Sequence, residues 1–294
     1  MLDLDGTVLG PDGSISSGTA ASILRARNFG WEVVIATGRT ASESADLLAA
    51  IGHQGITIFA GGGLACDTAS GSTIHRRTLD QAIVEQVSEW LIEHGHRTLV
   101  LKDHGAAGFD YLAVGSSPYH AASKWWFAQR PIAVMEVDTI GEDPCPSDSI
   151  RVGAVAGACV LDDFEAVLRD DLGDRARILH WSAVTGSHAV NAPVCLLEVL
   201  HPSADKWTMM AHLREEIGVV SAGGPVVAIG DGLNDIEMLA HADIGIAMGH
   251  ASDAVIRHAN WVTGDYQSQG FATAIDAVLD GKMERLVPVQ RACG

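Results

Sequence analysis

The sequence predicts an α/β fold in which a parallel sheet of short strands is interrupted by a large α+β insertion. Strand-like and helix-like stretches alternate over about the first 79 residues and are joined by short turns. From about residue 80, strands outnumber helices and the connections become longer and more polar. After about residue 202 the first pattern returns. We therefore expect a core of residues 1–79 and 202–294 and an inserted domain of residues 80–201.

Hydrophobic periodicity and turn residues place the individual elements. In the first core segment we expect a serine-capped helix over residues 17–29, a buried strand over 31–36, a helix over 40–51 and a strand over 56–60. In the insertion we expect helices over 81–94 and 161–172 and strands over 97–101, 111–114, 132–137, 150–156, 176–181 and 194–201. In the second core segment we expect a helix from the Ser203 cap to Gly218, strands over 225–229, 244–247 and 261–262, and a helix over 270–279.

The predicted first strand is unusually short. A buried parallel strand commonly reads as a run of about five apolar residues, but only Met1 and Leu2 precede Asp3. Either this strand is stunted or the natural chain begins upstream of Met1, and we favour the second reading. If Met1 is the true first residue, we expect a frayed strand that positions Asp3 poorly.

The composition excludes several classes of protein. The 294 residues carry a formal net charge of −18, which repels nucleic acids, anionic membrane surfaces and any phosphorylated substrate that no local cation neutralises. The longest apolar stretch, residues 152–161, is too short and glycine-rich to span a bilayer, and no signal peptide is recognisable. The five cysteines are scattered and indicate neither a disulfide framework nor a zinc site. We therefore expect a cytoplasmic protein without nucleic-acid or membrane partners.

Two carboxylates stand close together at the start of the chain, in Asp3-Leu-Asp-Gly-Thr7. They follow what reads as the end of a strand, and the Asp5-Gly6 pair indicates a turn that can direct both side chains around one reacting atom. One carboxylate can attack phosphorus while a second carries the proton. An acidic turn, or the metal-binding motif of unrelated transferases, has the same pattern.

Thr37 and Lys206 are candidate phosphate ligands. Thr37 follows a buried strand, where its hydroxyl can donate to a phosphoryl oxygen or cap the next turn. Lys206 is expected at the third or fourth position of the helix that Ser203 caps, where a cation opposes the helix dipole. A phosphate at the same helix end would remove that cost. A solvated surface lysine is the alternative reading of Lys206.

The segment Gly230-Asp-Gly-Leu-Asn-Asp235 places three oxygen-bearing side chains directly after a buried strand. Hard oxygen ligands in such an arrangement suit Mg²⁺ better than a soft metal. A helix N-cap with a tight glycine turn is the alternative, although two aspartates and an asparagine exceed what a cap uses. Ligands bind beyond the carboxyl ends of the strands in parallel sheets, where Asp3, Asp5 and Thr37 are also expected.

Taken in order along the chain, these segments resemble the four motifs of the haloacid dehalogenase-like (HAD) hydrolases. The segments are Asp3-Leu-Asp-Gly-Thr7, Thr37-Gly38-Arg39, Lys206 and residues 230–239. Residues 242–251 and 259–263 are similar to the Cof-type phosphatase branch in particular. The resemblance implies a Rossmann-like parallel-sheet core, with residues 80–201 as the large α/β cap domain that this branch inserts between its second and third motifs.

The resemblance also implies a role for each motif residue. Asp3 would be the nucleophile that forms an aspartyl-phosphate, and Asp5 would be the general acid to the leaving alcohol and then the base to the attacking water. The phosphate and substrate ligands that it implies are Thr37, Gly38, Lys206 and Asn234. The Mg²⁺ ligands that it implies are Asp3, Asp5 through its main-chain carbonyl, Asp231 and, in a supporting position, Asp235.

Two departures from the branch bear on specificity. Trp207 follows Lys206 where the branch commonly has glycine, and residues 60–64 read Ala-Gly-Gly-Gly-Leu where it commonly has an Asn-Gly pair facing the substrate. The inserted domain carries no motif of its own. Its candidates for substrate contact are Lys102, His104, Trp125 and Trp126, for which ordinary packing or a solvated charge is the alternative.

Three functions fit these residues. The first is a Mg²⁺-dependent phosphatase, a phosphoric monoester hydrolase, acting on a small phosphorylated metabolite and by analogy a sugar phosphate. The second is a phosphomutase of the same superfamily. The third is a non-catalytic phosphoaspartate signalling or binding protein. The inserted domain and the Gly-Asp-Gly-x-Asn-Asp segment are arguments against this third function.

Overall fold

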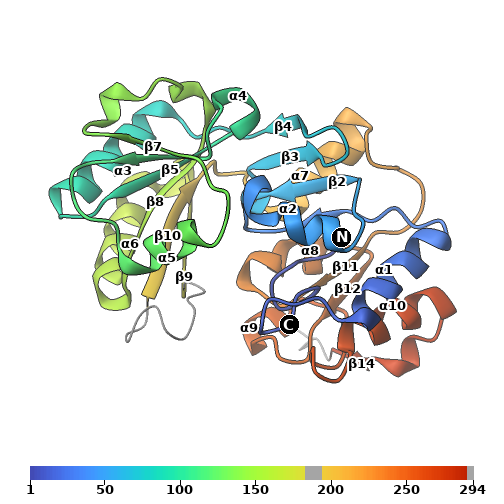
Figure 1. Cartoon of the computed structure of the whole chain (residues 1–294). Helices are drawn as coiled ribbons and strands as arrows, with labels where there is room; N and C mark the ends of the chain where they lie inside the picture. The colour runs from blue at the N-terminus through green and yellow to red at the C-terminus, as the bar shows by residue number, and fades with distance from the viewer. Residues whose placement is uncertain (183–193, 290–294) are drawn as a thin grey trace. The chain divides into compact units, whose positions relative to one another are not determined.

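The computed structural model describes residues 1–182 and 194–289, which divide into two compact units. The first unit comprises Met1–Arg39, Ser44–His75 and the segment that starts at Asp205. The second comprises Thr40–Glu43 and Arg76–Ala204. Figure 1 shows this interruption by colour: the blue and the orange-to-red ends of the chain build the first unit, and the teal-to-yellow segment between them in the sequence builds the second.

The first unit contains helices packed on a sheet. Its strands are β1 (Ile35–Ala36), β2 (Ile56–Phe59), β3 (Leu64–Asp67), β4 (Ser72–Arg76), β11 (Val227–Gly230), β12 (Ile244–Ala247), β13 (Trp261–Val262) and β14 (Val287–Pro288). Its α-helices are α1 (Ser17–Asn28), α2 (Ala41–Ala50, whose first turn belongs to the second unit), α7 (Lys206–His212), α8 (Ile236–His241), α9 (Asp253–Ile256) and α10 (Gly270–Asp280). The elements of this unit therefore come from two separate segments of the chain.

The N-terminal residues join two halves of this sheet. The strand orders are β1-β2-β3-β4 and β11-β12-β13-β14, and Leu2 makes parallel bridges to Ile35 of β1 and to Ile229 of β11. The pairs β1–β2, β11–β12 and β12–β13 are parallel, which confirms the predicted parallel core, while β2–β3 and β13–β14 are antiparallel. The sheet is thus parallel at its centre and mixed toward its edges.

A buried apolar layer fixes helices α7 and α8 to this sheet. It contains Met209 of α7 and Leu239 of α8 together with Ile58 and Ala228 of the strands. Helices α1 and α10, from the two ends of the chain, lie side by side in Figure 1 and pack against each other. The strands are therefore held at their register by helices from both chain segments.

The second unit is built on a six-stranded sheet. Its strands are β5 (Thr98–Lys102), β6 (Tyr111–Val114), β7 (Val134–Val137), β8 (Ser149–Gly157), β9 (Arg177–Ser182) and β10 (Val194–Leu200), in the order β7-β6-β5-β8-β10-β9. Its helices are α3 (Gln81–Glu93), α4 (His104–Ala107), α5 (Ala121–Ala128) and α6 (Ala158–Leu172). Only β6 and β7 pair in parallel among the strand pairs described here, so this unit has the α+β character expected of the insertion.

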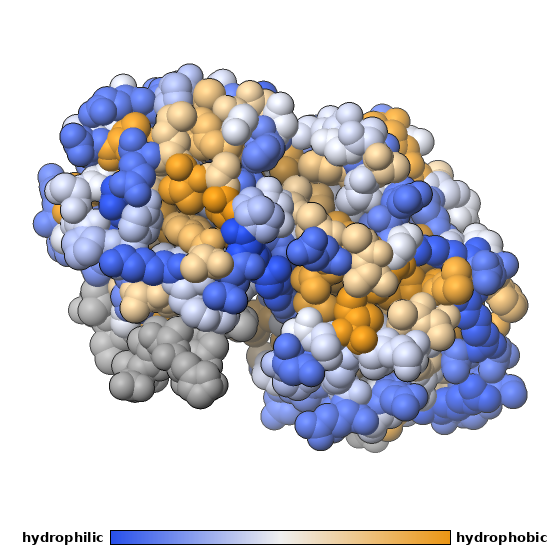
Figure 2. Space-filling model, viewed as in Figure 1, coloured by the Kyte–Doolittle hydropathy of each residue, from blue (hydrophilic) through white to orange (hydrophobic). Residues whose placement is uncertain are grey.

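The surface is largely hydrophilic, with smaller hydrophobic patches, on the face drawn in Figure 2. Several large apolar side chains are exposed at separate places along the chain, including Leu24, Phe29, Val167 and Val287. Isolated exposed residues of this kind are common in folded proteins. Within residues 1–182 and 194–289, no helix is both long enough and apolar enough to cross a membrane.

Candidate active site

Hydrogen bonds on both sides position the N-terminal segment that carries Asp3. The Leu2 N–H donates to the Val34 carbonyl at 2.9 Å, and the Asp3 N–H donates to the Ile229 carbonyl at 3.0 Å. Met1 and Leu2 are buried. The stunted strand is therefore paired along both edges and is not frayed, and Asp3 emerges at the carboxyl ends of the neighbouring strands β1 and β11.

Lys206 begins helix α7, which corrects one expectation. Asp205, not Ser203, is the N-cap, and its side chain accepts a hydrogen bond from the Thr208 N–H at 2.8 Å. Lys206 is therefore the first helical residue rather than the third or fourth. The carboxylate of Asp205 already satisfies the helix start, so the argument that a phosphate is needed there to offset the dipole does not hold. The alternative of a solvated surface lysine is also wrong, because the Lys206 side chain is completely buried.

The buried ammonium of Lys206 bridges two carboxylates. Its Nζ donates to Asp3 Oδ1 at 2.5 Å and to Asp235 Oδ1 at 2.6 Å. Burial alone would lower the pKa of Lys206, but the charges of Asp235 and Asp3 raise it above its ordinary value. Burial and then the charge of Asp235 raise the pKa of Asp3 well above its usual range, and Lys206 opposes that rise only in part.

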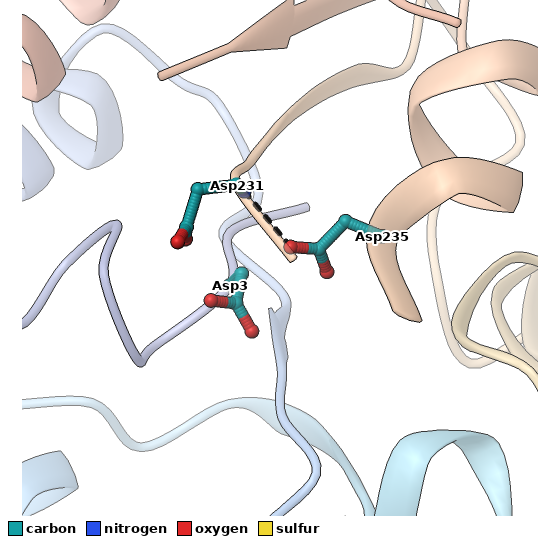
Figure 3. Close-up of side chains that lie close together, drawn as sticks. All are labelled: Asp3, Asp231 and Asp235. Atoms are coloured by element: carbon teal, nitrogen blue, oxygen red, sulfur yellow. Dashed lines mark hydrogen bonds between the residues drawn. The ribbon is translucent and has the colours of Figure 1, made fainter. Parts of the chain in front are cut away.

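Asp231 completes a group of three convergent carboxylates (Figure 3). Carboxylate oxygens of Asp3, Asp231 and Asp235 all lie within 4.8 Å of one another. The Thr7 hydroxyl donates to Asp231 Oδ1 at 2.7 Å, while His250 Nε2 lies 3.5 Å from Asp231 Oδ2. Burial raises the pKa of Asp231, and the hydrogen bond from Thr7 counteracts part of the rise. The three acids are thus held together at a cost in free energy that a cation would relieve.

The donor set fits a hard divalent cation. All three ligand candidates offer carboxylate oxygens, the donors that Mg²⁺ prefers. Gly6 leaves room beside them, since a Cβ at that position would lie 2.2 Å from Asp231 Oδ2. Asp235 already accepts the Asp231 and Gly232 N–H groups on Oδ2 at 2.9 and 2.8 Å. Asp3 and Asp231 are therefore better available to a metal, and Asp235 shapes the loop that presents Asp231.

The predicted phosphate ligands lie in the same unit. Thr37 is completely buried, and its Oγ1 accepts the Arg39 N–H at 3.1 Å, which still allows the hydroxyl to donate its own proton. Asn234 approaches Gly38, because its Nδ2 lies 3.6 Å from where a Cβ on that glycine would stand. The structure thus brings Thr37, Gly38 and Asn234 into the unit that holds the acidic cluster.

The glycine loop after β2 contacts both Thr37 and Asp205, the residue directly before Lys206. The Gly61 N–H donates to the Thr37 carbonyl at 2.9 Å. A Cβ on Gly62, whose φ is +110°, would lie 2.2 Å from the Asp205 carbonyl oxygen, directly before Lys206. This close approach requires glycine, so the loop that departs from the branch pattern sets the distance between Thr37 and the start of α7.

We expect Gly62→Ala to lower the free energy of unfolding by about 2–3 kcal/mol and kcat by roughly tenfold or more, because the added methyl displaces Asp205 and with it Lys206. Gly61→Ala is the matched control. It also has a positive φ, +63°, but no atom of the described residues lies within 4 Å of its Cβ position. It should cost only about 1 kcal/mol and leave kcat nearly unchanged. Thermal unfolding and phosphate-release rates measure both variants, and equal losses of kcat would contradict the argument.

The second unit places the four candidate substrate contacts differently. Lys102 is buried, pairs with Asp143 and donates to the Ser149 hydroxyl at 2.8 Å, so the alternative of a solvated charge is wrong for it. His104 is half-exposed beside Asp110. The rings of Trp125 and Trp126 lie 6.0 Å apart between centroids. None of these contacts shows a substrate role, which stays a prediction.

Three residues close to the acidic cluster had no assigned role in the sequence prediction. Thr7 binds Asp231, Arg39 binds Asp5, and His250 lies beside Asp231. Thr7 and Arg39 were visible as members of the first two motifs, but their partners lie 224 and 34 positions away in the sequence. His250 lies in the segment 242–251 that resembles the Cof-type branch, but that resemblance gave it no role.

Comparison with known proteins agrees with this fold. The model of the haloacid dehalogenase-like hydrolase family matches residues 1–275. The 5-amino-6-(5-phospho-D-ribitylamino)uracil phosphatase YcsE of Bacillus subtilis is 26% identical over 276 residues, covering 93% of this chain and 92% of YcsE. Two other curated relatives, from Haemophilus influenzae and Arabidopsis thaliana, are matched over only 62% and 45% of their length, so the chain spans less than two thirds of them.

Solved structures share the fold over most of the chain. A haloacid dehalogenase-like hydrolase from Bacteroides thetaiotaomicron superimposes with a TM-score of 0.74 at 24% identity, covering 94% of this chain and 97% of that one. The HAD subclass IIB sugar phosphatase BT4131 superimposes with a TM-score of 0.73 at 19% identity, covering 94% and 97%. At these identities the likeness shows the fold.

The fold and the acidic site define an α/β hydrolase with an inserted domain. The chain belongs to the haloacid dehalogenase-like hydrolase family, and the predicted resemblance to its Cof-type branch is confirmed.

Proposed function

We propose that the chain is a Mg²⁺-dependent phosphatase that hydrolyses a small phosphorylated metabolite through an aspartyl-phosphate on Asp3. The observation that carries the proposal is the convergence of Asp3, Asp231 and Asp235 around the buried Lys206. A purely structural cluster would be costly, because three carboxylates are gathered with one ammonium to offset them. Such an arrangement is typical of a functional site that binds a charged ligand.

The proposed reaction has two half-reactions. Asp3 attacks phosphorus as the bond from phosphorus to the alcohol oxygen breaks, and Asp5 gives that alcohol its proton. Water then attacks phosphorus, the bond from phosphorus to Asp3 breaks, and Asp5 takes a proton from the water. Thr37 and Lys206 donate to the phosphoryl oxygens, where negative charge gathers in both steps.

Asp3, the main-chain carbonyl of Asp5 and Asp231 would hold the Mg²⁺, with Asp235 in support. A bound Mg²⁺ supplies positive charge that favours the ionised form of the acids and offsets the charge of the phosphoryl group. Asp235 also positions its neighbours directly. It orients Asp231 by accepting two backbone hydrogen bonds, and it binds Lys206.

The substrate class rests on the relatives. One relative is named as a phosphatase of a phosphorylated ribitylamino-uracil, and one structural neighbour as a sugar phosphatase. Both names describe phosphate esters of polyhydroxylated carbon chains, which favours a sugar phosphate or a similar polyol phosphate here. We assign the choice among such substrates to the inserted domain of residues 80–201, which we propose is the cap domain of a core formed by residues 1–79 and 202–294.

The metal requirement gives a direct test. Purified protein should release phosphate from p-nitrophenyl phosphate with Mg²⁺, stop when EDTA is added and recover when Mg²⁺ is restored. Mg²⁺ should also raise the melting temperature, because binding relieves the repulsion among the carboxylates. Asp231→Asn should lose this thermal shift, whereas Asp12→Asn, which changes an exposed turn, should keep it. EDTA-resistant turnover would contradict the metal assignment.

The product separates the phosphatase from the alternatives. A panel of sugar, polyol and nucleoside monophosphates should give free phosphate with at least one polyol phosphate. An isomerised sugar phosphate without free phosphate would identify a phosphomutase instead. A long-lived phosphoprotein without turnover would identify a signalling module, and either result would overturn the proposal.

A further inference from the structure

Arg39 holds the carboxylate of Asp5 at two points. Its Nε donates to Asp5 Oδ2 at 2.8 Å, and its Nη2 forms an ion pair with Asp5 Oδ1. Such paired contacts between a guanidinium and a carboxylate fix the plane as well as the distance of the acid. The Asp5 side chain is 42% exposed, whereas that of Arg39 is only 10% exposed. The acid is therefore the more exposed partner, and the better buried arginine orients it.

Two backbone hydrogen bonds fix Arg39 in the turn that carries the predicted phosphate ligand Thr37. Its N–H donates to Thr37 Oγ1 at 3.1 Å, and its carbonyl accepts the Ala60 N–H at 2.9 Å. The arginine backbone is therefore anchored both to the predicted phosphate ligand and to the glycine loop that contacts Asp205. Because its backbone is held in this turn, the Arg39 side chain can fix the position of Asp5 relative to the predicted phosphate ligand Thr37.

The geometry points to Arg39 as a positioning residue that orients Asp5 for the hydrolysis of the aspartyl-phosphate. This inference rests on the proposed phosphatase reaction. In that half-reaction the water oxygen bonds to phosphorus, the bond from phosphorus to Asp3 breaks, and the water proton passes to Asp5. Each Asp5 oxygen accepts one bond from Arg39 and keeps a second lone pair for that proton.

A surface ion pair would have much smaller consequences. Exposed pairs contribute about 0–1 kcal/mol and their loss is hardly felt. Arg25 provides the comparison within the same unit, because it pairs with Asp276 and Asp280 but is 42% exposed. Arg39 differs in its burial, in its two-point contact and in having a predicted catalytic acid as its partner.

The two half-reactions can be separated with p-nitrophenyl phosphate. Nitrophenolate leaves without needing much help from an acid, so phosphorylation of Asp3 should depend little on the orientation of Asp5. Hydrolysis of the aspartyl-phosphate needs a well-placed base, which is worth about 10²–10⁴-fold in rate. A variant that misplaces Asp5 should therefore release nitrophenol once per enzyme and then slow down.

Rapid-mixing experiments should compare the wild type with Arg39→Gln, Arg39→Lys and Arg25→Gln. For Arg39→Gln we expect a burst approaching one nitrophenol per active site, a steady-state rate reduced by about ten- to a hundredfold, and a phosphoryl group on the quenched protein by intact mass. Arg39→Lys keeps the charge but not the planar fork, so it should show the same burst with a smaller loss. Arg25→Gln should behave like the wild type.

The outcomes distinguish this inference from the proposed function. Wild-type turnover in Arg39→Gln, or a slower rate without a burst, would overturn the positioning role. If Arg39→Gln does not fold, Arg39→Lys decides the question by the same criterion. A wild-type protein that releases no phosphate with Mg²⁺ would instead overturn the phosphatase assignment.

Discussion

Asp3→Asn is expected to lower kcat/KM for p-nitrophenyl phosphate by about 10⁴-fold or more, because it removes the proposed nucleophile. The same substitution should hold or raise the melting temperature of the metal-free protein. The pKa of Asp3 is raised in the fold even though Lys206 lies beside it, so the surroundings as a whole oppose its charge. At neutral pH that charge costs stability, and a neutral asparagine removes the cost.

Calorimetry and steady-state kinetics on the same preparation check both halves of this result. Asp12→Asn, in an exposed turn, should change neither quantity. Activity that persists in Asp3→Asn would exclude Asp3 as the nucleophile. A large loss of stability would instead show that the lost activity reflects a damaged fold.

Lys206→Met is expected to destabilise the metal-free protein by about 3–5 kcal/mol, because it leaves the buried carboxylates of Asp3 and Asp235 adjacent without their shared cation. It should also lower kcat by about 10²–10³-fold, since the proposed donor to the phosphoryl oxygens is lost. Urea unfolding and phosphate release measure the two effects. Lys282→Met, at an exposed lysine, is the control and should be close to neutral.

A double variant makes this prediction sharper. When Asp3→Asn is added to Lys206→Met, one of the two opposed carboxylates disappears, so part of the lost stability should return. The interaction free energy in such a double-mutant cycle for contacting groups is typically about 0.5–3 kcal/mol. Since Asp3→Asn alone is expected to hold or raise stability, strictly additive changes in the free energy of unfolding would mean that Lys206 and Asp3 do not interact in the way that their 2.5 Å contact indicates.

The alternation of strands and helices in the core could be predicted because each element has its own periodicity. The strands Ile244–Ala247 and Trp261–Val262 and the helix Gly270–Asp280 lie at or within one residue of their predicted bounds. The expected strand over 31–36 is shorter, Ile35–Ala36, because its neighbour at Leu2 offers only a short paired edge. Strand β3, which is antiparallel to β2, and strand β4 were not predicted, since glycines and polar residues hide their alternation.

The candidate site could be predicted where a short sequence motif contains the candidate catalytic or ligating residues. Asp3, Asp231 and Lys206 were named from their segments, and the structure brings them together, although their catalytic roles stay predictions. Arg39 as a partner of Asp5 could not be inferred, because nothing local shows where a long side chain reaches. The same holds for the cap of α7, where Ser203 and Asp205 are both capable and tertiary contacts decide for Asp205.

The place of the N-terminal segment between β1 and β11 has a consequence for the order of folding. Its backbone pairs with residues as far as 228 positions along the chain, as in the hydrogen bond from the Ile229 N–H to the Met1 carbonyl. Closing so long a loop is slow relative to local folding. During synthesis at about 5–20 residues per second, the segment would wait roughly 10–50 seconds for β11 to emerge.

The inserted segment has no such delay, because the strands of its sheet all lie within Arg76–Ala204. It can therefore fold on the ribosome while the core is still incomplete. The carboxylates of Asp3 and Asp231 come together only after Asp231 has been made, so a nascent chain cannot carry the assembled site until late in its synthesis. The position of Asp3 in the sheet therefore also determines how late in synthesis the acidic cluster can assemble.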